Sequence, residues 1–234
     1  MPETALVTGA TEGIGRAIAF GLGRAGFQVG VCARTAPRVD ALLADLAAAG
    51  ITAAGLPCDV GDPDQVARLA AHVERHLGPV DVLINNAGTG VIKPFGEITV
   101  DEWDGVFATN LRGLFLVTRA VLPGMRTRRR GDVVNVSSLS GKRGFPGGTA
   151  YAASKHAVMG FSESLMLEVR KEGIRVTALC PGSVDTKMIQ GQTLFERDPA
   201  KILKPEDVAE MVVALVRLPR RANVSELEIR PSDP

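Results

Sequence analysis

Tyr151 and Lys155 are the two residues whose types and spacing most directly suggest acid–base chemistry. They stand four residues apart in a segment of helical period, so both side chains lie on one face of the predicted helix. A free phenol has a pKa of about 10, which is too high for efficient proton exchange near neutral pH. A nearby ammonium group favours the phenolate and lowers this pKa. The pair alone also fits a surface tyrosine packed along a lysine side chain.

Two serines, Ser137 and Ser138, stand where a buried strand over residues 132–137 ends, upstream of this helix. A hydroxyl group at this place can hydrogen-bond the oxygen of a substrate carbonyl group. It equally fits a serine that caps a turn, and the residues alone leave both interpretations open.

A glycine-rich turn follows the first predicted strand and has the sequence Thr8-Gly9-Ala10-Thr11-Glu12-Gly13-Ile14-Gly15. Glycine lets the backbone turn tightly and approach a pyrophosphate closely. The helix that begins here offers free N–H groups and a partial positive charge to an anion. The G-x-x-x-G-x-G spacing differs from the common G-x-G-x-x-G pattern, and a plain tight turn would look similar. Its place at the first of several strand–helix units favours a phosphate site.

The end of the second predicted strand indicates which dinucleotide such a site prefers. An acidic residue there favours the free 2′-hydroxyl of NAD, and a basic residue favours the 2′-phosphate of NADP. Arg34 ends this strand and Arg38 follows one helical turn later. NADP(H) is therefore favoured over NAD(H), with Arg34 as the phosphate partner, although a solvated arginine would fit the same position. Glu12 adds a negative charge nearby and acts against NADP.

Short apolar, β-branched runs alternate with segments of helical period along the chain. Strands are predicted at residues 5–8, 28–33, 52–57, 80–85, 132–137, 175–180 and 224–229. Helices are predicted at residues 14–26, 36–49, 63–77, 100–128, 149–171 and 205–218, with interruptions near Gly113 and Pro123. Asp62 is the expected N-cap of the third helix. The alternation predicts an α/β fold, a Rossmann-type doubly wound parallel sheet of about seven strands with helices on both faces. Ligands bind such a sheet beyond the carboxyl ends of its strands, where most of the residues above fall.

Composition fits one globular domain over residues 1–234, with 45% hydrophobic and 23% charged residues. A formal net charge of +1 favours neither nucleic acid nor a membrane surface, and the basic run at 126–130 is interpreted as a solvated helix end.

Cys32, Cys58 and Cys180 predict buried, reduced thiols of a cytoplasmic protein. No signal peptide is recognised, and no apolar stretch approaches the ~20 residues of a membrane span. The histidines share no ligand spacing, so no metal site is predicted.

Together these motifs resemble the short-chain dehydrogenase/reductase family, in its single-domain branch, from Ala5 to about Thr186. The family's glycine motif matches residues 8–15, its Asn-Asn-Ala-Gly matches residues 85–88, and its Tyr-x-x-x-Lys matches Tyr151 and Lys155. Its catalytic serine lies thirteen residues before the tyrosine, which selects Ser138. Further matches are Asn110, the adenine-contacting pair Asp59-Val60, and the nicotinamide-flanking Pro181 and Gly182 with Val184 and Thr186.

The resemblance implies a catalytic set and a cofactor site. The catalytic set is Asn110, Ser138, Tyr151 and Lys155. The implied cofactor contacts are Gly9, Thr11, Gly13, Ile14, Gly15, Arg34, Asp59, Val60, Asn86, Ala87, Gly88, Tyr151, Lys155, Pro181, Gly182, Val184 and Thr186.

The resemblance also implies a mechanism, in which NADPH gives a hydride to a carbonyl carbon. Tyr151 then donates the proton to the oxygen, or removes it in the oxidative direction, while Ser138 holds and polarises that oxygen. Lys155 would lower the tyrosine pKa and bond the nicotinamide ribose, and Asn110 would hold a water that links Lys155 to solvent. The protein contributes orientation and electrostatics, and the hydride chemistry belongs to the cofactor.

A loop over residues 183–204 is expected to cover the substrate. Its apolar residues Met188, Ile189, Leu194 and Phe195, with Phe145, Val91 and Ile92 from other strand ends, suggest a mainly apolar pocket. A ketone or aldehyde with an apolar body is the expected substrate. Lys187 and Arg197 could instead bind an acidic substrate, but solvated loop charges are more common.

Two other functions share this fold. A dinucleotide-sensing regulatory protein is the first alternative, since a fold does not fix a function. An epimerase or dehydratase is the second, although such relatives are usually longer. The resemblance also implies a homodimer or homotetramer formed through the helices at 101–126 and 151–172.

Overall fold

The structure is a computed structural model that describes residues 2–189 and 201–232. Within these residues, seven strands form one sheet in the order β3-β2-β1-β4-β5-β6-β7, and every neighbouring pair is parallel. The strands are β1 (Thr4–Thr8), β2 (Gln28–Ala33), β3 (Ala53–Pro57), β4 (Val80–Asn85), β5 (Gly131–Val136), β6 (Ile174–Pro181) and β7 (Glu226–Ile229). The predicted doubly wound sheet is confirmed, and every strand begins and ends within two residues of its prediction.

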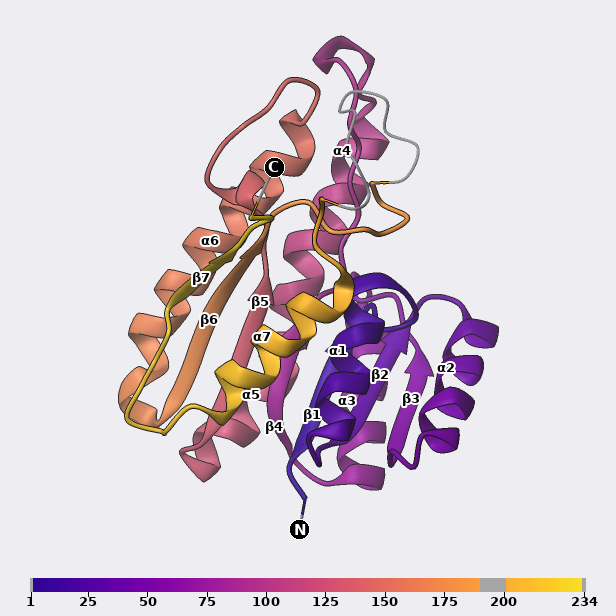
Figure 1. Ribbon diagram of the computed structural model, residues 1–234, viewed down its shortest axis with the longest axis vertical. Helices are drawn as coiled ribbons and strands as arrows, with labels where there is room; N and C mark the ends of the chain where they lie inside the picture. Colours follow the sequence, from indigo (N-terminus) through magenta and orange to yellow (C-terminus); the bar gives the residue numbers. More distant parts are fainter. Residues whose placement is uncertain (1, 190–200, 233–234) are drawn as a thin grey trace.

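Helices cover both faces of the sheet (Figure 1). One face carries α1 (Gly13–Arg24), α2 (Ala36–Ala48) and α7 (Pro205–Arg217), and the other carries α3 (Pro63–Leu77), α5 (Leu114–Arg128) and α6 (Thr149–Val169). Successive strand residues point to opposite faces, so Val7 packs in the first core and Leu6 in the second. Each face therefore has its own hydrophobic core, and the strand ends remain free to carry polar residues.

The region predicted as one helix over residues 100–128 has three parts: α4 (Val100–Phe107), a π-helical segment (Ala108–Gly113) and α5. The interruption predicted near Gly113 is confirmed. The one predicted near Pro123 is wrong, because α5 runs through this proline. Pro123 lies on the exposed side of α5, while Val121 and Met125 are buried in the core, so packing holds the helix in spite of the missing backbone donor.

The prediction that no stretch approaches a membrane span is wrong by length and composition alone, because residues Val100–Arg128 meet both criteria. Core helices of globular proteins meet them too. Here Val117, Val121 and Met125 pack against the sheet, and charged residues lie in the first and last turns of the stretch.

The helix ends follow local sequence. Asp62 caps α3 as predicted, since its carboxylate accepts hydrogen bonds from the backbone N–H groups of Asp64 and Gln65 at 2.9 and 3.1 Å. The α-helical part of α6 ends at Val169, two residues before its predicted end, and a short 3₁₀ turn (Arg170–Glu172) follows it up to Gly173.

The three cysteines are buried and free, as predicted.

An ion cluster fastens the amino-terminal edge of the sheet, far from the strand ends that carry the polar residues. Asp132 at the start of β5 pairs with Arg175 of β6 at 2.5 Å and with Arg220 at 2.6 Å. Arg175 also donates hydrogen bonds to the carbonyl oxygens of Leu218 and Ala222, at 2.9 and 3.2 Å. The connection between α7 and β7 is thereby anchored to strands β5 and β6.

Candidate active site

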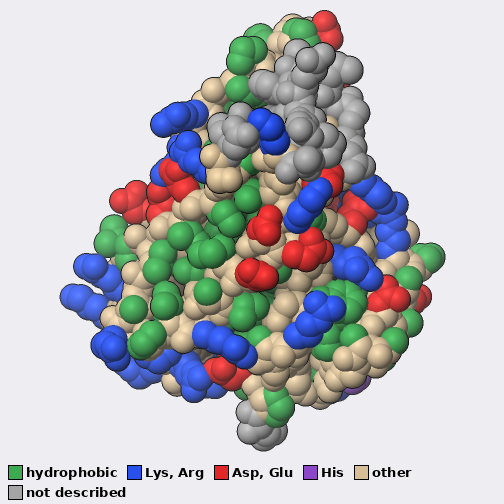
Figure 2. Space-filling model, viewed as in Figure 1, with side chains coloured by type: hydrophobic (Ala, Val, Ile, Leu, Met, Phe, Trp, Pro, Cys, Tyr) green, Lys and Arg blue, Asp and Glu red, His purple; other side chains and the backbone are tan. Residues whose placement is uncertain are grey.

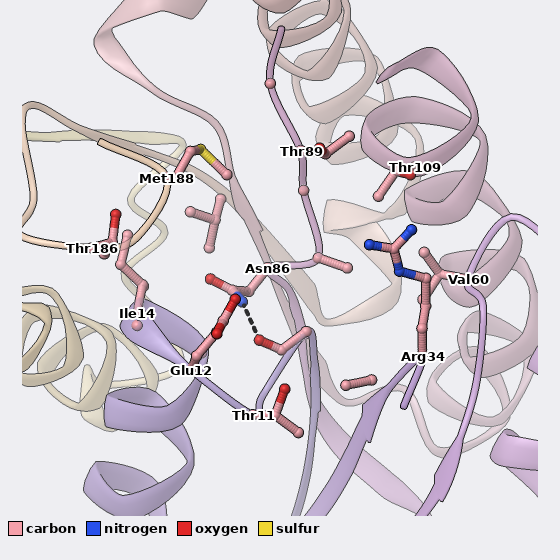
Figure 3. Close-up of a pocket in the computed structure, with 18 of the residues that line it drawn as sticks. Thr11, Glu12, Ile14, Arg34, Val60, Asn86, Thr89, Thr109, Thr186 and Met188 are labelled. Atoms are coloured by element: carbon pink, nitrogen blue, oxygen red, sulfur yellow. Dashed lines mark hydrogen bonds between the residues drawn. The ribbon is translucent and has the colours of Figure 1, made fainter. Parts of the chain in front are cut away.

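A cavity of about 500 Å³ opens at the carboxyl ends of the strands, around the neighbours β1 and β4 (Figure 3). Strand order reverses here, since β2 lies on one side of β1 and β4 on the other, and doubly wound sheets bind ligands at this point. Most of the predicted cofactor contacts line the cavity: Gly9, Thr11, Gly13, Ile14, Gly15, Arg34, Asp59, Val60, Asn86, Ala87, Gly88, Tyr151, Lys155 and Thr186.

Three predicted contacts at the end of β6 and in the segment after it do not line the cavity. Pro181 is the last, buried residue of β6, and Gly182 donates its N–H to the carbonyl oxygen of Ile229 at 2.8 Å. Val184 is 3% exposed and packs in the hydrophobic core. Thr186 is the residue of this motif that reaches the cavity.

The loop after β1 and the loop after β4 are locked together by hydrogen bonds. The hydroxyl of Thr8 accepts bonds from the backbone N–H groups of Asn86 and Ala87, each at 3.0 Å. The Asn86 amide donates to the carbonyl oxygen of Thr8 at 3.0 Å and to that of Gly9 at 3.1 Å, and the bond to Gly9 is dashed in Figure 3. The floor of the cavity is therefore fixed by the protein itself.

Glycine is required at two places in this floor. Gly9 has a φ of +63°, and a Cβ there would lie 2.8 Å from the Cα of Ala87. A Cβ on Gly15 would lie 2.3 Å from the carbonyl oxygen of Gly9. The close approach of these backbones, together with the start of α1, forms a cradle that suits a pyrophosphate group.

Charged side chains surround the end of the cavity next to β2. Arg34 is exposed and makes no ion pair within the described residues. The Glu12 carboxylate, expected to act against NADP, pairs with Arg38 at 3.4 Å and with Lys187 at 3.2 Å. Its negative charge is therefore shared by two cations, one of which is the exposed ammonium of Lys187.

The structure separates the two serines after β5. The Ser137 hydroxyl, 3% exposed, donates a hydrogen bond to the carbonyl oxygen of Lys155 at 3.1 Å and so holds α6 against the end of β5. The Ser138 side chain lowers the pKa of the Tyr151 phenol, and its hydroxyl accepts a hydrogen bond from the backbone N–H of Ser140 at 3.1 Å. Ser138 is thus the serine placed beside the phenol.

Burial controls the protonation of Tyr151 and Lys155. It raises the pKa of the Tyr151 phenol, while the hydrogen bond with Ser138 acts in the opposite direction. It also lowers the pKa of the Lys155 ammonium to about 8. The Lys155 Nζ lies 5.8 Å from the Tyr151 ring centroid and donates to the carbonyl oxygen of Val136 at 2.8 Å. That Lys155 lowers the pKa of Tyr151 stays a prediction. The protein's own groups hold Tyr151 as a neutral phenol near pH 7.

Asn110 lies in the π-helical segment and does not line the cavity. Its Oδ1 accepts a hydrogen bond from the Thr89 N–H at 2.8 Å, and its Nδ2 donates to the Thr89 carbonyl oxygen and to the Ser154 hydroxyl, each at 2.9 Å. Ser154 in turn donates to the carbonyl oxygen of Tyr151 at 2.7 Å. The Asn110 side chain therefore ties the loop after β4 to the first turns of α6.

Several residues of the cavity were not predicted as contacts: Ala33, Thr35, Arg38, Cys58, Thr89, Gly90, Thr109 and Val136. Ala33, Cys58 and Val136 end or directly follow strands, so their position was a usable signal. Thr109 lies in the π-helical segment, and its place beside the cavity depends on tertiary packing. Ser154 was also missed, although a serine between Tyr151 and Lys155 is a readable polar position.

The substrate side is described in part. Met188 lines the cavity and is 42% exposed, while Val91 and Ile92 are half-buried nearby on the loop after β4. The predicted substrate-loop residues Leu194, Phe195 and Arg197 lie outside the described residues.

Residues 3–196 match the sequence pattern described as short chain dehydrogenase. The chain belongs to the short-chain dehydrogenase family. It is therefore a nicotinamide-dependent oxidoreductase that acts on carbonyl or alcohol groups.

Relatives of this short-chain dehydrogenase resemble it over most of its length. A putative ketoacyl reductase of Streptomyces coelicolor is 41% identical and the match covers 92% of this chain and 90% of the relative. An acetoacetyl-CoA reductase of Shinella zoogloeoides is 39% identical, with 92% and 91% covered. The crystal structure of a variant actinorhodin polyketide ketoreductase with NADPH superimposes with a TM-score of 0.90 at 39% identity, with 98% and 96% covered.

The low pKa of Lys155 makes the stability of this dehydrogenase depend on pH. The folded state releases this proton near pH 8, whereas the unfolded chain holds it to about pH 10.5. Between these values the unfolded state binds more protons, so stability rises with pH. We expect the free energy of unfolding of the wild type, relative to Lys155→Met, to increase by about 1–2 kcal/mol from pH 8 to pH 9.5. Urea unfolding of both proteins measures these free energies. A difference between wild type and Lys155→Met that does not change with pH would contradict the lowered pKa of Lys155.

Proposed function

We propose that this chain is an NADP(H)-dependent carbonyl reductase in which Tyr151 donates a proton to the substrate oxygen. The observation that carries the proposal is the pairing of the Tyr151 phenol with the buried ammonium of Lys155, both of which line the glycine-floored cavity, and the action of the Ser138 side chain on this phenol. A phenol whose pKa is raised stays protonated at neutral pH, and a protonated acid is what a reduction requires.

Ser138 and Tyr151 would bind one carbonyl oxygen together. Two hydroxyl groups that converge on one oxygen polarise the C=O bond and stabilise the negative charge that develops during reduction. Ser137 is a poor candidate for this role, since its hydroxyl is engaged with the Lys155 carbonyl oxygen. The geometry supports the choice of Ser138 that the family resemblance implied.

The residues of the cavity floor fit a nicotinamide dinucleotide. Gly9 and Gly15 bring backbone close enough to hold a pyrophosphate, Arg34 would pair with a 2′-phosphate, and Lys155 would bond the nicotinamide ribose. Bound NADPH supplies the hydride that adds to the carbonyl carbon. The NADPH-bound ketoreductase, 39% identical to this chain, supports the preference for NADP(H).

Asn110 would contribute to proton transfer through the backbone of the π-helical segment in which it lies. Its side-chain amide is fully used by Thr89 and Ser154. A π-helical segment shifts the backbone hydrogen bonds by one residue and can leave a carbonyl oxygen without a helical partner. We propose that a main-chain carbonyl oxygen of this segment, rather than the Asn110 side chain, holds the water that links Lys155 to solvent.

The proposed substrate is a ketone with an apolar body. Met188 and the half-buried Val91 and Ile92 support this choice. The relatives described as ketoacyl and acetoacetyl-CoA reductases make 3-oxoacyl thioesters the first class to assay. An NADPH-consumption screen over ketones, aldehydes, quinones and 3-oxoacyl thioesters tests the proposal, and a dinucleotide-binding chain that turns over none of them would favour the sensor alternative.

We expect Tyr151→Phe to lower kcat by about a thousandfold, because it removes the transferable proton and leaves the dinucleotide floor intact. The Kd for NADPH should stay within about threefold of the wild-type value. Steady-state kinetics and calorimetric titration measure the two quantities. Near-normal turnover by this variant would contradict the role of Tyr151.

A matched pair of serine variants provides the control. Ser138→Ala should lower kcat by about a hundredfold, whereas Ser140→Ala should leave it unchanged, because Ser140 reaches Ser138 through its backbone N–H alone. Equal activity of the two variants would remove Ser138 from the site.

We expect Arg34→Asp to shift the preference, measured as the ratio of kcat/KM for NADPH and NADH, toward NADH by about a hundredfold. The change removes the cation that would pair with the 2′-phosphate and adds a carboxylate that can accept the ribose hydroxyl. Arg221→Asp is the charge-matched control, since Arg221 is exposed and lies outside the cavity lining. An unchanged ratio in Arg34→Asp would refute the role of Arg34.

We also propose that the chain assembles as a homodimer or homotetramer through its helices. Phe115 on α5 and Leu167 on α6 are large apolar side chains that are 45% and 53% exposed in one protomer. Figure 2 shows further hydrophobic side chains over the face that carries α7 and β7, where Val213 and Leu227 are partly buried. We expect Phe115→Asp to lower the assembly state in sedimentation velocity, and a wild-type chain that sediments as a monomer would contradict the proposal.

A further inference from the structure

Two of the three cysteines stand at neighbouring strand ends beside the cavity. Cys32 is the last residue but one of β2, and Cys58 directly follows β3, the strand next to it at the edge of the sheet (Figure 1). The register pairs Cys32 with Leu56, and the Cys58 N–H donates to the carbonyl oxygen of Ala33 at 2.8 Å. Alternate residues of a strand point to the same face, so Cys58 follows Leu56 on the face that carries Cys32. Both cysteines accordingly pack in the same hydrophobic core.

The two thiols differ in access and in protonation. Both are buried, but Cys58 lines the cavity, whereas Cys32 is 0% exposed and lies outside its lining. The Cys32 side chain lowers the pKa of the Cys58 thiol, while the Cys58 side chain and burial raise the pKa of Cys32. Arg68 also lowers the pKa of Cys58, against burial and the carboxylates of Asp59 and Asp62, which raise it. Cys58 is therefore the thiol that loses its proton first, and the thiolate is the reactive form.

Neither thiol takes part in the proton or hydride transfer proposed above. A thiolate beside a second thiol is the arrangement from which a disulfide bond forms. In compartments that keep thiols reduced, such bonds are usually transient and serve catalysis or redox sensing.

We propose that Cys32 and Cys58 form an oxidation-sensitive pair, in which a peroxide oxidises Cys58 and a disulfide bond with Cys32 then distorts the dinucleotide cavity. The effect on dinucleotide binding rests on the proposed function, whereas formation of the bond does not. The two parts of the proposal can therefore be tested separately.

The reaction has two steps and consumes one hydrogen peroxide. The Cys58 thiolate attacks one peroxide oxygen, so that an S–O bond forms, the O–O bond breaks and hydroxide leaves to become water. The Cys58 sulfur loses two electrons and becomes a sulfenic acid, and the peroxide is reduced. The Cys32 sulfur then attacks this sulfur, the S–S bond forms, the S–O bond breaks, and the hydroxyl group leaves with the Cys32 proton as a second water.

The bond would act on the cavity from two sides. The Cβ atoms of a disulfide lie about 3.8 Å apart, so the two strand ends must draw together. The Cys32 carbonyl oxygen accepts a hydrogen bond from the N–H of Ala10, in the glycine-rich turn, at 3.0 Å. Asp59, which lines the cavity, directly follows Cys58. A movement of either cysteine therefore shifts the wall against which a dinucleotide would lie. Conversely, a bound dinucleotide would cover Cys58 and protect it.

Peptide mapping by mass spectrometry tests the bond. The wild-type chain is treated with hydrogen peroxide, unfolded, and alkylated so that all remaining thiols are labelled. We expect a peptide pair joined through Cys32 and Cys58 that dithiothreitol separates. Addition of NADP⁺ before the peroxide, which introduces no reductant, should slow its formation severalfold. A chain in which Cys32 and Cys58 are never joined would overturn the proposal.

Cys180 is the internal control in this experiment. Its Sγ lies 3.4 Å from the Sδ of Met159, outside the cavity lining, and burial raises the pKa of its thiol to about 11. We expect it to be recovered as a labelled thiol. Equal loss of the Cys180 thiol would show general oxidation of an unfolding chain and would overturn the selectivity of the pair.

Calorimetric titration with NADPH tests the effect on the cavity. Peroxide treatment should raise the Kd of the wild type by about tenfold or more, and dithiothreitol should restore it. Cys58→Ser and Cys180→Ser each replace one buried cysteine and are compared with their own untreated Kd. The peroxide effect should disappear in Cys58→Ser and persist in Cys180→Ser. An effect that persists in full in Cys58→Ser would overturn the proposal, whereas a wild type that forms the bond but binds no dinucleotide when reduced would overturn the proposed function.

Discussion

The hydrogen bonds between Thr8 and Asn86 join the two halves of the sheet at its functional edge. β1 and β4 are adjacent, yet the chain leaves them in different directions, toward α1 and toward the loop that carries Gly88 and Thr89. The Thr8 hydroxyl and the Asn86 side-chain amide connect the two diverging loops by four hydrogen bonds. Since the floor of the cavity is made from both loops, its shape depends on this bridge. Because the floor is fixed before a ligand binds, its loops lose little conformational entropy on binding.

The second half of the site is organised by the end of β5 rather than by α6 itself. The Ser137 hydroxyl donates a hydrogen bond to the Lys155 carbonyl oxygen, and the Lys155 ammonium donates one to the carbonyl oxygen of Val136. The helix is thus bound to the strand end at one residue by both its backbone and its side chain. This arrangement buries a cation beside a phenol and disfavours the charged form of each. A cationic ligand ring nearby would act on the phenol in the other direction, so the acidity of Tyr151 is open to control by what the cavity holds.

The sequence predicted the sheet, most helix ends and most of the cavity, because these follow from periodicity and from the rule that strand ends carry the ligand site. The remaining parts depend on tertiary packing. Pro123 reads as a helix break, but buried neighbours hold α5 through it. Thr109 lines the cavity from the π-helical segment, which periodicity did not predict. Spacing shows that Lys155 is near Tyr151, but not that its ammonium contacts the carbonyl oxygen of Val136. The segment after β6 shows a similar limit, since the motif names its residues and the fold decides that Thr186, not Val184, faces the cavity.

The ion cluster of Asp132, Arg175 and Arg220 lies at the edge of the sheet opposite the cavity. Its partners include carbonyl groups of the α7–β7 connection, and among the described residues none of its members lines the cavity. Stabilising contacts and reacting groups thus occupy opposite ends of the same strands. The loops at the carboxyl edge can therefore change in length and composition while the frame below them stays intact, so a single architecture of this kind can be adapted to new carbonyl compounds by alteration of one rim.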